Sequence, residues 1–221
     1  MKYFCVSTEK GLTAIMSWYV LHVETGQENV VRAMIRKFYN PSSMYAIVPK
    51  RRLLEKRQGH IYEVCRTIFP GYVFVNTEMN AKTYNDLRRL PKCYRLLNNF
   101  NHRYHQIESK EIRVNPEDRI ESYSFSKIDD EEMRPILQLI DKDEIIGYSS
   151  LYLRNTRAVV CDGPLTGEEE RIKKIDARKK RARIILRLNG AEKYIDVGIK
   201  IVSVSENAQM NITPKNQSEA N

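Results

Sequence analysis

The apolar residues of the first hundred positions change their spacing from strand-like to helix-like and back. Residues 17–23 are rich in β-branched and aromatic side chains and predict a buried strand. The apolar residues that follow recur at three and four positions, as on one face of a helix: Val30, Val31, Met34, Ile35 and Phe38. Thr25 and Glu28 have the spacing of a capping box at the start of this helix, and Pro41 forbids its continuation.

Further short apolar runs follow this helix: residues 45–48, 53–54, 61–68 and 72–75. Residues 57–60, Arg-Gln-Gly-His, are typical of a hairpin tip between two of them. A second helix is predicted over 81–90 and a last strand over 93–97. We interpret the order as β-α-β-β-β-α-β, an α+β sandwich with the helices on one face of the sheet.

The middle of the chain is polar, and residues 98–127 predict a long loop or an insertion. His102 and His105 have a spacing that metal sites use, but no second ligand pair accompanies them, which favours a solvated loop. A helix is predicted over 129–141, where acidic residues at the start suit the helix dipole. Pro135 conflicts with this helix unless the regular part begins close to it.

The last third of the chain fits two patterns. Residues 157–161 predict a strand and 162–164 a turn. Residues 168–188 are strong helix formers, yet from Lys179 onward polar and apolar positions also alternate as in a strand. The pattern alone favours a helix.

Composition narrows the class of protein. The chain of 221 residues has a formal net charge of +9, which is common among proteins that meet nucleic acid. No apolar run reaches the length of a membrane span, so no membrane association is expected. Residues 1–15 lack a signal-peptide core and are expected to be a dispensable extension or the product of an upstream start codon, and residues 206–221 are expected to be a disordered tail. The cysteines are isolated, which indicates a reducing cytoplasm and neither zinc nor disulfides: Cys5, Cys65, Cys93 and Cys161.

Two segments of the chain carry distinctive motifs. One is Phe69-Pro70-Gly71-Tyr72-Val73, and the other is residues 163–167, Gly-Pro-Leu-Thr-Gly, followed by 172–176. The first is close to the FPGYV strand in the N-terminal (NGN) domain of the bacterial NusG family of transcription factors, and the second is similar to a KOW motif. The resemblance implies an NGN α/β sandwich with an antiparallel sheet over 16–141, a linker over 142–156, and an SH3-like KOW β-barrel over 157–205. It also implies strands rather than a helix over 168–196, although some relatives hold this domain in a helical form until recruited.

Within the family, the KOW loop and the basic run after it look most like the LoaP group of specialised paralogues. LoaP-like proteins are understood to bind a structured RNA leader through this domain, and such an RNA hairpin is the partner that the resemblance implies. The candidate RNA-binding residues are dense and only Asp176 opposes them: Arg171, Lys173, Lys174, Arg178, Lys179, Lys180, Arg181 and Arg183. Phosphate contacts dominate nucleic-acid affinity, whereas a solvated face without a partner is the alternative.

A general NusG offers a different loop of the barrel to a ribosomal protein or to the termination factor Rho. The corresponding loop is 187–191, Arg-Leu-Asn-Gly-Ala. Asn189 stands where an aromatic residue is expected and Ala191 where an arginine is expected, which weakens ribosome and Rho coupling as a hypothesis.

The resemblance also implies that the NGN domain binds the clamp region of the largest RNA polymerase subunit. Its candidate residues are aromatic anchors and the turn between them: Trp18, Tyr19, Phe69, Pro70, Gly71 and Tyr72. Strand alternation allows at most one of Trp18 and Tyr19 to face the partner. The predicted hairpin is the candidate contact to upstream or non-template DNA, through Lys50, Arg51, Arg52, Lys56 and Arg57.

The sequence therefore predicts a monomeric, cytoplasmic bacterial factor for operon-targeted antitermination, with no cofactor and no metal. A general NusG-like coupling factor and a KOW-type ribosome-binding protein are the alternatives. An enzyme is not expected, because the only carboxylate cluster, 129–132, is better explained as charge at a helix start.

Overall fold

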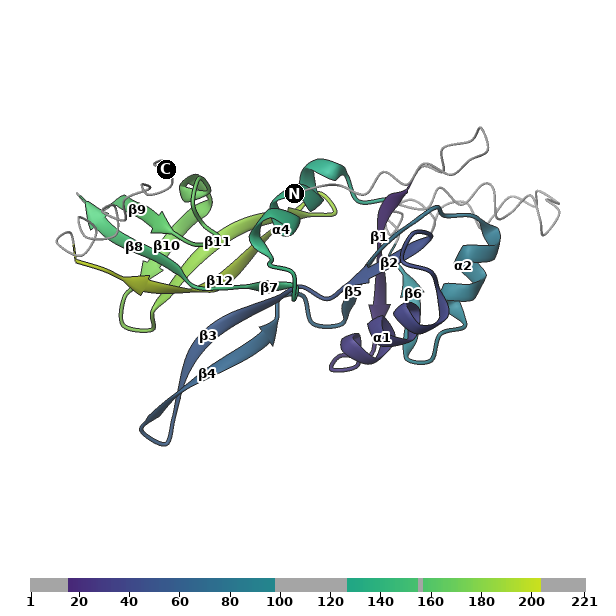
Figure 1. The fold of residues 1–221 in the computed structure, drawn as a ribbon, viewed down its shortest axis with the longest axis horizontal. Helices are drawn as coiled ribbons and strands as arrows, with labels where there is room; N and C mark the ends of the chain where they lie inside the picture. Colours follow the sequence, from purple (N-terminus) through teal and green to yellow (C-terminus); the bar gives the residue numbers. More distant parts are fainter. Residues whose placement is uncertain (1–15, 98–126, 155–156, 204–221) are drawn as a thin grey trace, which may run out of the picture. The chain divides into compact units, whose positions relative to one another are not determined.

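The structure is a computed structural model that describes three stretches of the chain: residues 16–97, 127–154 and 157–203. These residues form two compact units (Figure 1). Among the described residues, the first unit combines 16–49, 67–97, 127–136 and 187–191, and the second combines 50–66, 137–154, 157–186 and 192–203. The fold is mixed α+β, as predicted, and strands outnumber helices among the described residues.

The first unit contains an antiparallel sheet with the strand order β2-β5-β1-β6. Its strands are β1 (Ser17–Val23), β2 (Met44–Ile47), β5 (Tyr72–Thr77) and β6 (Cys93–Leu96). The helices of this part are α1 (Glu28–Phe38) and α2 (Ala81–Arg88). The strands and helices predicted at these positions are confirmed within one or two residues at each end.

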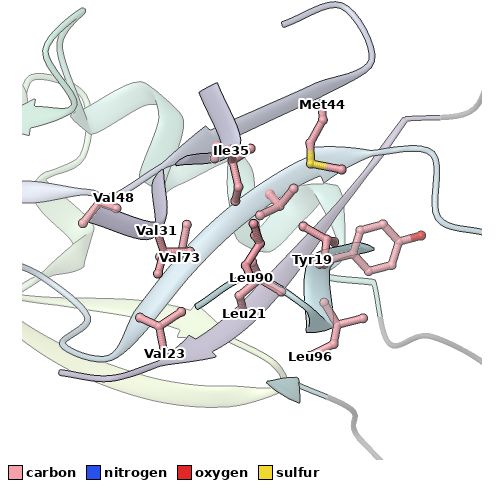
Figure 2. Packing of buried hydrophobic residues seen from close by; sticks show 13 residues of the cluster. Tyr19, Leu21, Val23, Val31, Ile35, Met44, Val48, Val73, Leu90 and Leu96 are labelled. Carbon is pink, nitrogen blue, oxygen red and sulfur yellow. The ribbon is translucent and has the colours of Figure 1, made fainter. Parts of the chain in front are cut away.

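The core of the first unit lies between one sheet face and these helices. Alternation along β1 places Tyr19, Leu21 and Val23 in the same buried cluster as Val31 and Ile35 of α1 (Figure 2).

The apolar stripe of α1 is narrower than predicted. Val30 is 48% exposed and Phe38 is 66% exposed. Val30 is exposed because it is turned about 100° around the helix axis from Val31, which is buried. Phe38 is exposed because it is the last residue of the helix.

The predicted capping box is wrong. The N-cap is Gln27, whose side chain makes no capping bond, and Glu28 is the first helical residue. The Glu28 carboxylate is buried at 3% exposure, where it accepts hydrogen bonds from the backbone N–H groups of Gly26 and Gly71. The bond to Gly71 is 2.6 Å long and crosses 43 positions of sequence, so the residue predicted to cap the helix holds the turn after Pro70 instead.

The chain forms four strands between α1 and α2, where three were predicted. The two middle ones are β3 (Lys50–Arg57) and β4 (His60–Thr67), which form a hairpin with its tip at Gln58 and Gly59, as predicted. Both tip residues have positive φ, which suits a tight hairpin turn. This hairpin belongs to the second unit, where β3 pairs in parallel with β7 (Ile145–Ile146).

Residues 98–126 of the polar segment predicted as a loop or insertion, which include His102 and His105, lie outside the described residues. Its two ends are described and lie at the same sheet edge. Leu97 N–H donates to the Val20 carbonyl at 2.8 Å, and Ile128 N–H donates to the Trp18 carbonyl at 2.8 Å. The chain therefore leaves and rejoins the sheet two residues apart along β1.

Helix α4 (Asp130–Leu139) confirms the helix predicted after this segment. Pro135 lies inside this helix and does not interrupt it. Met133 and Ile136 are buried, at 1% and 0% exposure.

The second unit is β-rich, with a five-stranded sheet in the order β10-β11-β12-β8-β9. Its strands are β8 (Ser149–Arg154), β9 (Arg157–Asp162), β10 (Ile172–Asp176), β11 (Arg181–Leu188) and β12 (Ala191–Ile201), and a short 3-10 helix spans Glu169–Arg171. The predicted linker over 142–156 is wrong, because β7 and β8 form there and β8 pairs with both β9 and β12.

The helix favoured by pattern over 168–188 is also wrong, and the strands implied by the resemblance are confirmed. Along β11 every second residue is buried: Ala182, Ile184, Leu186 and Leu188. Burial of one face of a strand decides against helical propensity here.

Gly163 shows why the predicted turn needs glycine. Its φ is +100°, and a Cβ there would lie 2.6 Å from the Tyr148 carbonyl oxygen and 2.7 Å from Ser149 Cα. Two backbone segments meet at this corner of the sheet, so the glycine has a structural role.

Candidate functional site

The turn between β10 and β11 carries the densest part of the predicted basic run. Asp176 Oδ1 accepts a hydrogen bond from the backbone N–H of Lys179 at 2.9 Å, which closes the turn. Lys180 has a φ of 52°, and Arg178, Lys179 and Lys180 are all exposed. The turn therefore presents successive cations to solvent.

Three of the eight predicted RNA-binding residues are engaged inside the protein. Arg171 pairs with Glu168, and Arg183 pairs with Asp196 at 2.8 Å. The hydrogen bond from Arg183 lowers the pKa of the Asp196 carboxyl. Arg181 Nη2 donates to the Leu54 carbonyl at 3.2 Å.

The prediction that only Asp176 opposes the run is thus corrected. Glu168 pairs with a basic residue close to it in sequence, and Asp196 is brought there by strand pairing. Lys173 makes only a 3.5 Å contact with the Glu170 carbonyl. In the part of the chain that the structure describes, the side chains of the other four have neither an ion-pair partner nor a hydrogen bond: Lys174, Arg178, Lys179 and Lys180.

Burial divides the predicted polymerase-binding residues. Tyr19 and Phe69 are core residues, at 8% and 6% exposure, and the Phe69 ring packs on Phe74 with centroids 5.4 Å apart. Gly71 is also buried, whereas Pro70 is exposed. Tyr19 and Phe69 are therefore unavailable as aromatic anchors. Trp18 and Tyr72 remain partly exposed, and Trp18 lies on the face opposite Tyr19, as alternation predicted.

An aromatic group that the sequence did not indicate lies on this second sheet face. The His22 ring is 5.7 Å from the Tyr72 ring and 5.4 Å from the Tyr94 ring. Tyr94 is 61% exposed. The register of β6 shifts beside His22, which pairs with Arg95 while Val23 pairs with Cys93. This bulge leaves Tyr94 unpaired, and simple alternation cannot predict its position.

The candidate DNA hairpin neutralises much of its own charge. Arg57 and Arg66 both donate to Glu55, at 3.0 and 2.8 Å, and they lower the pKa of that carboxyl from 4.5 to about 2. Arg52 lies 3.5 Å from Glu63. Arg52 and Arg57, two of the predicted DNA-contact residues, are thus held in exposed ion pairs.

The remaining hairpin candidates differ in exposure. Arg51 is half-buried, its pKa is lowered by burial, and it donates to the Asp196 carbonyl. Lys50 is partly buried, and Lys56 is exposed.

The turn between β11 and β12 has a carboxylate bound to it. Glu132 of α4 accepts hydrogen bonds from the backbone N–H groups of Asn189 and Gly190, at 2.7 and 2.9 Å. Both turn residues have positive φ, so their N–H groups point to the same side. This is the loop that the family resemblance associates with ribosome or Rho coupling.

Two kinds of feature are absent from the described stretches. Within residues 16–97, 127–154 and 157–203, no cluster of three or more His, Cys, Asp or Glu side chains is arranged to hold a metal. Over the same residues, no helix is long and apolar enough to cross a membrane.

The fold and these surfaces define an α+β protein with an aromatic sheet face in one unit and a cationic β-turn in the other. Residues 16–114 match the family model described as "Transcription termination factor nusG". The chain is 24% identical over 178 residues to the transcription termination/antitermination protein NusG of Escherichia coli K12, covering 78% of this chain and 87% of that protein. Residues 16–114 are thus similar to the NusG family, and a weaker similarity to NusG proteins extends over most of the chain.

Two further similarities are more limited. The Haemophilus influenzae NusG protein is 30% identical over 90 residues, and the match spans 38% of this chain and about half, 49%, of that protein. A solved structure described as "Domain interaction in Thermotoga maritima NusG" has 19% identity and a TM-score of 0.40, and covers 83% of this chain and 94% of that one.

Proposed function

We propose that this chain is an operon-targeted transcription elongation and antitermination factor, which binds RNA polymerase through its first unit and structured leader RNA through its second. The observation that carries the RNA part is the β10–β11 turn, where Arg178, Lys179 and Lys180 are exposed and have no ion-pair partner among the described residues. The similarity of residues 16–114 to the NusG family supports the transcription context.

The turn suits phosphate rather than a protein surface. Three successive cations on a closed turn repel one another, and phosphates relieve that repulsion while releasing condensed counterions. Lys174 adds a fourth exposed charge on β10. A structured RNA is the best target, because proteins recognise RNA stems largely through backbone contacts and shape.

The second sheet face suits the clamp region of the largest polymerase subunit. Trp18, His22, Tyr72 and Tyr94 offer partly exposed rings held on paired strands. Rigid aromatic side chains of this kind dominate interface energies, since they bury a large area at a small entropic cost. The factor then acts as a monomer in the bacterial cytoplasm and suppresses pausing and termination.

RNA binding by the full chain tests this function. The triple variant Lys174→Ala/Arg178→Ala/Lys179→Ala removes three free cations and keeps Lys180, whose left-handed backbone disfavours substitution. We expect affinity for a structured leader RNA to fall roughly 100-fold, from about fivefold per lost phosphate contact. Lys37→Ala/Lys82→Ala, two exposed cations on α1 and α2, is the control and should change affinity by less than about twofold. Equal binding by both variants, or no preference over scrambled RNA, contradicts the RNA part.

Capture by RNA polymerase tests the other part. His22→Ala/Tyr94→Ala should abolish co-purification with polymerase and leave RNA affinity unchanged. If the variant still co-purifies with polymerase, the polymerase contact lies outside this sheet face.

A further inference from the structure

The β3–β4 hairpin is hydrogen-bonded to the five-stranded sheet of the same unit. Arg51 Nη1 donates to the Asp196 carbonyl of β12 at 2.7 Å. Arg181 Nη2 of β11 donates to the Leu54 carbonyl of β3 at 3.2 Å. Since each side supplies one donor and one acceptor, the hairpin is held in place at two points along β3.

Backbone packing fixes the same contact. A Cβ at Gly198 of β12 would lie 2.5 Å from the Arg52 carbonyl oxygen and 2.5 Å from Tyr148 Cε1. Only glycine permits so close an approach of two backbones. The hairpin and the sheet therefore share one continuous surface.

This contact brings two basic segments together. Arg181, which reaches Leu54, directly follows Lys180 of the cationic turn. Lys56 lies two residues beyond Leu54, about 7 Å along a strand that rises about 3.3 Å per residue. We therefore expect the exposed cations of the hairpin and of the turn to lie close enough together for one nucleic acid to contact both.

The charges at this junction are available to an external anion. Lys56 is exposed and has no ion-pair partner in the described stretches of the chain. Arg57 and Arg66 share Glu55, in exposed pairs that contribute little stability and that a phosphate can replace. On the turn, Asp176 is the neighbouring acid, and it is hydrogen-bonded to the Lys179 N–H.

We propose that Lys56 and Arg57 of the hairpin and residues 178–180 of the turn form one phosphodiester-binding surface that holds a single RNA stem-loop. The hairpin then acts in RNA capture, as a second set of contacts beside the turn. This inference rests on the proposed function, and it adds residues from a segment at least 121 positions away in the sequence.

Salt-dependent binding of the full chain to an RNA stem-loop tests it, measured by fluorescence anisotropy. The hairpin variant Lys56→Ala/Arg57→Ala should lower affinity roughly tenfold and reduce the slope of log K against log salt concentration by about 1 to 2. Lys37→Ala/Lys82→Ala carries the same loss of charge outside this surface and should keep the wild-type slope. Thermal unfolding of each variant establishes that it is folded.

The outcomes separate this inference from the proposed function. If the hairpin variant has the slope and affinity of the control while the turn variant still loses binding, the shared surface is wrong and the proposed function stands. If the turn variant also binds normally, both fail.

A duplex DNA of the stem sequence distinguishes the two sources of phosphodiester. We expect the hairpin variant to lose more affinity for the RNA stem-loop than for this duplex. A loss confined to DNA would overturn the proposal and return the hairpin to the DNA contact predicted from sequence.

Discussion

The β3–β4 hairpin and the β10–β11 turn are similarly basic in sequence and differ in how much of that charge is free. In the hairpin, Glu55 binds two arginines and Glu63 lies beside a third. In the turn, the one carboxylate, Asp176, is hydrogen-bonded to a backbone N–H and leaves the lysine ammonium groups unpaired. Strand register, more than a count of Lys and Arg, therefore decides which cations are already paired within the protein.

A single added methyl group at Gly198 should disrupt the packing of the hairpin on the five-stranded sheet. Gly198→Ala places a Cβ against the Arg52 carbonyl, and we expect a loss of about 1–3 kcal/mol in the free energy of unfolding, as for other overpacked sites. Urea denaturation measures it. Gly147→Ala is the matched control, because nothing lies within 4 Å of its added Cβ. Equal stability of the two variants would show that the hairpin does not pack on β12.

Removal of the shared carboxylate should make the hairpin more like the turn. Glu55→Gln releases Arg57 and Arg66 from their ion pairs, and we expect RNA affinity to rise about threefold as phosphate takes their place. Glu24→Gln breaks a comparable exposed pair with Lys92 in the first unit and serves as the control in the same binding assay. An equal rise in both variants would mean that net charge alone is responsible.

The smallest effect concerns the acidity of Glu55. Its pKa of about 2 lies below the ordinary 4.5, so the stability from its ion pairs is fully present above about pH 4.5 and is lost as pH falls through about 2. Arg66→Ala removes the larger cause, and the pKa should move back toward 4.5. NMR titration of the Glu55 carboxyl carbon measures this, and an unchanged midpoint would assign the low pKa to something other than Arg66.

Local signals in the sequence predicted most of the fold. Alternation identified β1, turn chemistry identified the hairpin tip, and three- and four-residue spacing identified α1. The same signals failed where a partner is distant in sequence. Glu28 has the spacing of a helix cap, yet it binds Gly71, because buried backbone N–H groups need an acceptor wherever the fold places them.

The candidate site was predictable to a similar degree. The basic run was visible in the sequence, but its pairing was not: Asp196 reaches Arg183 only through the pairing of β11 with β12. Tyr94 was missed because a β-bulge in β6 changes which face of the sheet its side chains point to. Propensity favoured a helix over β10 and β11, whereas burial of alternate side chains required strands.

The edge of the first sheet has a consequence for how this chain can change in length. Residues 97 and 128 are bonded to the Val20 and Trp18 carbonyls, so the ends of the connection between them are held close together whatever its length. The entropy of closing a flexible connection grows only with the logarithm of its length, about 0.6 kcal/mol for each doubling. A change in the length of this connection therefore costs the sheet little stability.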